Sequence, residues 1–88
     1  MERMFRVLLH NDNTHTIEEV INALMNIFHI TEESARHSTL AADVFGRGIV
    51  TIEPEHKAEL HKNDMIEMGL GATIEEVDDA DIPPLFRL

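Results

Sequence analysis

The chain has 88 residues, which make one small domain and leave no room for a second. Seven Lys and Arg residues stand against 17 Asp and Glu residues, for a net charge of −10. This balance argues against a nucleic-acid partner, because phosphate binding depends on clustered cationic side chains, and it favours a cationic ligand or a basic protein surface. There is no cysteine, which excludes disulfides and thiolate chemistry, and no apolar run approaches the roughly 20 residues of a membrane span.

The first predicted elements are a strand and a helix joined by a polar turn. Residues 4–10 are rich in strand formers and run into the turn cluster of residues 11–14. Thr16 and Glu19 then have the T-x-x-E spacing of a capping box, in which each side chain accepts a hydrogen bond from the other residue's backbone. The spacing of the following apolar residues predicts a helix with one buried stripe, made of Ile17, Val20, Ile21, Leu24 and Phe28.

A second helix is predicted from Thr31, a typical N-cap residue, to Gly46, which can adopt the left-handed conformation that ends a helix. Small side chains dominate the face expected to point inward: Ala35, Thr39, Ala42 and Val44. Such a face either lets another element approach closely or leaves a cavity, and the pattern fits both outcomes.

The remaining elements are a strand over residues 48–52, a third helix over residues 54–68 that Gly69 closes, and a strand over residues 73–77. Ala58, Met65 and Met68 form the apolar stripe of the third helix. The order β-α-α-β-α-β predicts an α+β fold, a two-layer sandwich of a three-stranded antiparallel sheet with three helices on one face. Residues 1–77 form this domain, and residues 78–88 form an acidic, proline-containing C-terminal tail.

The sequence gives little indication of a metal site or of enzymatic activity. The six histidines include no pair at the i, i+4 spacing of a helical metal site, and His10, Asp12 and His15 around the turn are typical of solvated polar groups. No glycine-rich phosphate loop or nucleophile motif is present. We therefore expect no metal, no cofactor and no enzymatic activity.

The polar segment after the first strand carries a resemblance to a known family. Taken alone, it is a turn built from Asn and Asp side chains. The stretch F-R-V-L-L-H-N-D-N-T-H-T-I-E-E-V-I-N-A-L, however, resembles the signature of the ClpS adaptors: an aromatic, a basic residue and an apolar triplet, followed by N-D-D-x-T-P-M-E-x-V-x-x-x-L. The similarity covers roughly residues 4–77, and the family has the same six-element order.

The resemblance implies an adaptor that binds the free, bulky hydrophobic N-terminal residue of other proteins (an N-degron) and hands these substrates to a Clp AAA+ ATPase of the ClpA or ClpC type. The implied protein is a monomer without nucleic-acid or membrane partners, in bacterial cytoplasm or plastid stroma. Only about three residues precede the first strand, whereas family members carry a longer arm that engages the ATPase. Two alternatives stay open: a ClpS-like modulator or inhibitor of a Clp ATPase that binds no N-degron, and an unrelated protein-interaction domain.

The resemblance also implies where the substrate's α-amino group is held. It places the amine near Asn11, with Asp12 and Asn13 in the same loop. The family's second loop acid is Asn13 here, and the family's amine-contacting histidine is Asp43 here. We therefore expect Asn11 and Asp43 to hold the ammonium, with Asp12 as a supporting acceptor.

The hydrophobic pocket implied by the resemblance departs from the family pattern. Ile17 stands where the family has a gatekeeper methionine, and Thr39 and Ala42 replace a methionine and a valine. These changes predict altered specificity, toward larger or more polar side chains. The complete expected sets are His15, Ile17, Val20, Thr39, Ala42 and Leu70 for the pocket, and Ala58, Glu59 and His61 for docking to the ATPase.

Overall fold

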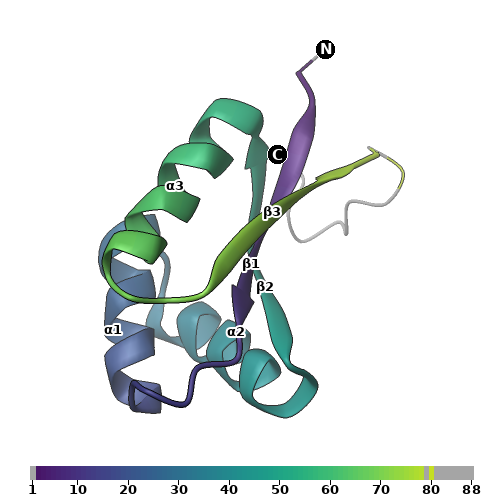
Figure 1. Cartoon of the computed structure of the whole chain (residues 1–88). Helices are drawn as coiled ribbons and strands as arrows, with labels where there is room; N and C mark the ends of the chain where they lie inside the picture. Colours follow the sequence, from purple (N-terminus) through teal and green to yellow (C-terminus); the bar gives the residue numbers. More distant parts are fainter. Residues whose placement is uncertain (1, 79, 81–88) are drawn as a thin grey trace.

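A computed structural model describes residues 2–78 and 80 of the chain. Its elements confirm the predicted order and the α+β class (Figure 1). The predicted tail lies outside the described residues, except for Asp78 and Ala80. The elements are β1 (Met4–His10), α1 (Ile17–Phe28), α2 (Glu32–Phe45), β2 (Arg47–Pro54), α3 (Glu55–Glu67) and β3 (Ala72–Val77).

The three strands form one antiparallel sheet in the order β2-β1-β3, so β1 is hydrogen-bonded along both edges. For example, Arg6 of β1 lies opposite Ile52 of β2 and Glu75 of β3. The register between β1 and β2 shifts between Val7 and Leu8. Because β1 is the central strand and is hydrogen-bonded to both neighbours, the backbone is fixed at the point where the following loop begins.

The core lies between the sheet and the helices. Phe5, Val7 and Leu9 alternate along β1 and point into it, and Leu8 on the other face of the strand is buried as well. The predicted capping box is present at the start of α1: the Glu19 N–H donates to Thr16 Oγ1, and the Thr16 N–H donates to Glu19 Oε1. Buried residues of the three helices complete the core, among them Val20, Ile21, Leu24, Ala35, Ala42, Ala58 and Met65.

Three side chains expected on buried faces are exposed instead: Ile17 at the start of α1, Val44 and Met68. Val44 is 69% exposed, because the inner face of α2 is formed by Ala35, Ser38, Thr39 and Ala42. Val44 follows Ala42 by two residues, about half a helical turn, and so lies on the opposite side. Met68 is 47% exposed because α3 ends at Glu67 and Met68 is its C-cap. The predictions for these last two residues were wrong for different reasons: Val44 lies within α2 but on its outer face, whereas Met68 lies past the end of α3.

A glycine lets α2 lie directly on β2. A Cβ added to Gly48 would come within 2.4 Å of the Ser38 carbonyl oxygen, closer than real Cβ atoms approach. The Ser38 hydroxyl also donates to the Ile49 carbonyl oxygen at 2.7 Å. These contacts fix α2 against the edge strand and thereby set where its inner face meets the end of β1.

Candidate functional site

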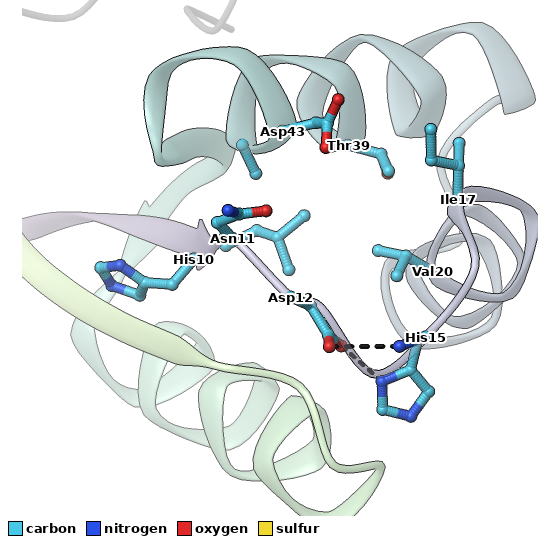
Figure 2. Close-up of a pocket in the computed structure, with 10 residues that line it drawn as sticks. His10, Asn11, Asp12, His15, Ile17, Val20, Thr39 and Asp43 are labelled. Atoms are coloured by element: carbon cyan, nitrogen blue, oxygen red, sulfur yellow. Dashed lines mark hydrogen bonds and ion pairs between the residues drawn. The ribbon is translucent and has the colours of Figure 1, made fainter.

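The candidate site is a hollow bounded by the end of β1, the loop after it, the start of α1 and the inner face of α2 (Figure 2). It encloses about 290 Å³ of space, part of which is open to solvent. Its lining combines polar and apolar side chains: Leu9, His10, Asn11, Asp12, His15, Ile17, Val20, Thr39, Ala42 and Asp43.

A backbone contact joins the two sides of the polar rim. The Asn11 N–H donates to the Gly46 carbonyl oxygen at 2.9 Å, which ties the end of β1 to the C-cap of α2. Gly46 has φ of +92°, the left-handed conformation that glycine adopts without strain. Asp43 lies within one turn of this cap, so Asn11 and Asp43 project over the same edge of the hollow (Figure 2).

Asp12 is held by its own loop. Its Oδ1 accepts from the Thr14 N–H at 2.6 Å and from the His15 N–H at 3.2 Å, and its Oδ2 contacts His15 Nδ1. Its side chain is only 11% exposed. Burial by itself raises the pKa of the Asp12 carboxyl, but the hydrogen bonds from Thr14 and His15 outweigh it, so the pKa lies below its usual value.

His15 connects this loop to the end of α3. A Cβ added to Gly69 would lie 3.3 Å from His15 Cε1, so the ring occupies the space that the absence of a side chain leaves. Gly69 has φ of +83° and forms the turn after α3. His15 therefore contacts Asp12 through Nδ1 while its ring packs against this turn.

The inner wall of the hollow is apolar. Leu9, Val20 and Ala42 are all buried, and Ile17 lies at the edge with 40% of its surface exposed. Thr39 is also buried, and its hydroxyl donates to the Ala35 carbonyl oxygen at 2.7 Å, one turn earlier in the same helix. The hydroxyl is thus engaged by α2, and the wall offers a ligand mainly hydrocarbon.

The structure brings most of the predicted site residues together. Asn11, Asp12, Asp43, His15, Ile17, Val20, Thr39 and Ala42 all line the hollow. Asn13 is exposed on the loop and is not part of the lining, and Leu70 is buried in the main core, where its N–H donates to the Met65 carbonyl oxygen. Leu9 and His10 were missed, although the alternation along β1 already marks Leu9 as an inward-facing residue beside the loop.

The three residues expected at the ATPase-docking surface differ in accessibility. Ala58 is fully buried, so it contributes packing rather than exposed surface. Glu59 is exposed and pairs with Lys62 at 2.9 Å. His61 is half-buried: Nδ1 lies 2.5 Å from Glu53 Oε2, and its ring centroid lies 4.6 Å from that of Phe28.

The part of the chain that the structure describes has neither a metal-binding cluster nor a membrane-spanning helix. No three His, Asp or Glu side chains there gather closely enough to hold a metal ion. None of the described helices has both the length and the apolar character needed to cross a membrane. The hollow is the candidate site because it combines acceptor groups at its rim with an apolar wall beneath them.

Comparison with known proteins places this arrangement in a family. The family model described as "ATP-dependent Clp protease adaptor protein ClpS" matches residues 1–73. The chain belongs to the ClpS family. ClpS proteins are adaptors, and the chain is accordingly an adaptor of the Clp protease.

The share of a relative's own length that the match covers differs from one relative to the next. It is 35% identical over 83 residues to the ClpS adapter of Lawsonia intracellularis, a match that covers 88% of this chain and 76% of the relative. It is 46% identical over 46 residues to the ClpS adapter of Nitratidesulfovibrio vulgaris strain Miyazaki F, covering 52% of this chain and 46% of that relative. For the latter, the match spans about half the length of the relative.

A solved ClpS structure has the same fold. The structure of Agrobacterium tumefaciens ClpS2 bound to L-phenylalaninamide gives a TM-score of 0.82 at 24% identity, over 88% of this chain and 100% of that chain. At this identity the likeness shows the fold alone, with the ClpS order of strands and helices.

Proposed function

We propose that this ClpS protein binds the free, bulky hydrophobic N-terminal residue of substrate proteins and delivers them to a Clp AAA+ protease. The observation that carries the proposal is the pairing of acceptor side chains, Asn11 and Asp43, with the apolar wall of one hollow. A bulky hydrophobic N-terminal residue is complementary to this combination, because its α-ammonium donates hydrogen bonds and its neighbouring side chain is apolar. The ligand of ClpS2, L-phenylalaninamide, is such a molecule, which supports the same class of ligand here.

The magnitudes are sufficient for a selective interaction. An α-ammonium has three N–H donors, and hydrogen bonds to charged groups contribute roughly 1.5–3 kcal/mol each. Burial of a Leu or Phe side chain adds about 1.5–3 kcal/mol. After the loss of translational and side-chain freedom, a dissociation constant in the micromolar range, about −8 kcal/mol, is expected.

The wall of the hollow bears on which side chain is preferred. Thr39 and Ala42 stand where family members have larger residues, so more room is available. Because the Thr39 hydroxyl donates to its own helix, the added room is apolar. Of the two expected changes in specificity, this favours larger side chains over more polar ones.

We further propose that the protein acts as a monomer on a ClpA- or ClpC-type ATPase. The exposed side of α3 near Glu59 and the half-buried His61 remain the proposed docking surface, with Ala58 supporting it from inside. The relatives named above come from bacteria, which supports the cytoplasm of a bacterial cell over a plastid.

The test is a titration with two short peptides of one sequence that begins with Phe, one with a free amine and one acetylated. Acetylation removes the positive charge and two of the donors, so only the free peptide should bind, with micromolar affinity. A peptide beginning with Ser serves as the control for side-chain recognition. Equal affinity for the free and acetylated peptides, or no binding of either, would refute the proposal and leave a ClpS-like modulator of the ATPase.

A further inference from the structure

We infer that Asp12 and His15 form a clamp that holds the pocket loop in position, and that Asp12 is a positioning residue that makes no direct contact with the amine. The inference rests on the proposed function and refines it, because it divides the two acids of the hollow into different roles. Asp43 and the Asn11 side chain then remain as the acceptors for the ammonium.

The first argument is that the oxygens of Asp12 are already occupied. A carboxylate has about four acceptor positions, and Asp12 fills three of them within its own loop: two backbone N–H groups on Oδ1 and the His15 ring on Oδ2. For an ammonium to approach, at least one of these contacts would have to be weakened while the side chain is nearly buried. Giving up a hydrogen bond to this partly buried carboxylate offsets what a new one contributes, so a ligand gains little there.

The second argument is that Asp43, on the α2 side of the hollow, differs from Asp12 in its contacts. Among the ten side chains drawn in Figure 2, the only hydrogen bonds or ion pairs are those between Asp12 and His15. Asp43 is exposed and points over the hollow without a contact to the other drawn residues. An acceptor for a ligand should be accessible and unengaged before binding. Asp43 is exposed, and its side chain has no hydrogen bond or ion pair with another residue that the structure describes.

The third argument is that the clamp reaches a fixed point outside the loop. Asp12 fixes the backbone of Thr14 and His15, and the His15 ring in turn packs against Gly69 at the end of α3. The residues that follow, Thr16 and Ile17, begin α1 and the gate of the hollow. The clamp therefore fixes the position of the gate relative to the acceptors, which is a form of preorganisation for binding.

Isosteric variants separate the two roles. In Asp12→Asn the amide oxygen still accepts from both backbone N–H groups, and the amide nitrogen faces an imidazole that can change tautomer. We expect its affinity for the free-amine Phe peptide to stay within about threefold of the wild type. Asp43→Asn should lose about tenfold or more, since a charge-assisted bond becomes a neutral one. Glu33→Ala, an exposed position in the first turn of α2, is the control. A loss in Asp12→Asn as large as that in Asp43→Asn would overturn the inference.

A double-mutant cycle and a ligand-independent measurement complete the test. Asp12→Ala and His15→Ala both break the clamp, so the losses of affinity in the single variants and the double variant should be similar rather than additive. In the free protein, the Thr14 amide should exchange faster in Asp12→Ala and at the wild-type rate in Asp43→Asn. Additive losses, or an unchanged Thr14 exchange rate in Asp12→Ala, would refute the clamp. Failure of the wild type to bind any peptide would refute the proposed function, while the exchange rates would still decide on the clamp.

Discussion

The Asn11 N–H donates to the carbonyl oxygen of Gly46 across 2.9 Å, and this single bond joins the end of the central strand to the end of α2. The two chain segments that supply the acceptors of the hollow thus meet at their backbones. The separation of the Asn11 and Asp43 side chains is consequently set by main-chain geometry. A site of this kind can be tested by changing side chains without moving its frame.

Replacement of Asp43 by Ala should abolish binding of free-amine peptides and leave the fold intact. The carboxylate lies in the last turn of α2, where the negative end of the helix dipole repels it. Its removal should therefore leave stability unchanged or raise it by about 0.3–1 kcal/mol. Peptide titration and urea denaturation measure the two effects. Glu33→Ala, which removes an acid from the first turn of the same helix, is the matched control and should bind normally.

The stabilising effect of Asp12 should disappear at low pH. Its folded-state pKa is lower than the unfolded value of 3.8, since the loop hydrogen bonds outweigh the effect of burial. A lowered pKa means that the ionised carboxylate stabilises the fold above that value and that this contribution is lost as the pH falls through the folded pKa. The difference in unfolding free energy between the wild type and Asp12→Asn should thus be constant near neutrality and shrink below pH 3.8. A difference that grows on acidification would contradict this account.

Gly48→Ala should destabilise the protein and weaken peptide binding together. The new Cβ would lie 2.4 Å from the Ser38 carbonyl oxygen, and the backbone of α2 cannot yield as a flexible side chain would. Overpacking of this kind costs about 1–3 kcal/mol and would displace α2, which forms one wall of the hollow. Val44→Ala, which shortens an exposed side chain on the outer face of the same helix, is the control. Urea midpoints for the two variants should differ clearly.

Peptide binding should depend on the volume of the side chains in the wall of the hollow and hardly on their polarity. Thr39→Val keeps the shape and removes a hydroxyl that donates only to Ala35, so the ranking of Phe, Leu and Ser peptides should stay the same. Ala42→Leu adds bulk to a buried wall position and should reduce binding of the Phe peptide more than that of the Leu peptide. A changed ranking in Thr39→Val would show that its hydroxyl contacts the ligand.

The elements with strong local signals could be predicted from the sequence. The strand of residues 4–10, the capping box at Thr16 and Glu19 and the C-cap at Gly46 each depend on neighbours close in the chain, and all are present. The small-residue face of α2 had two possible readings, and the structure contains both. Near Gly48 the helix and strand are in close contact, while around Thr39 a hollow remains.

What the sequence could not predict depends on tertiary geometry. The contact of Asp12 with His15 requires the loop to turn back on itself, and the seat of His15 at Gly69 joins segments far apart in the chain. Ala58 matches the resemblance as a docking residue, yet it is fully buried, because a motif does not state which way a side chain points. Val44 was misplaced since the pattern of α2 is weak and its last turn is easily assigned to the wrong side.

The central place of β1 has a mechanical consequence. The strand is held by ladders on both edges and runs straight into the loop that forms the rim of the hollow. A force applied to a bound ligand along the direction of β1 would load both ladders in shear, so that many hydrogen bonds resist it at once. Under such a load the ligand should detach before the adaptor unfolds, as the proposed delivery of substrates to a Clp ATPase would require.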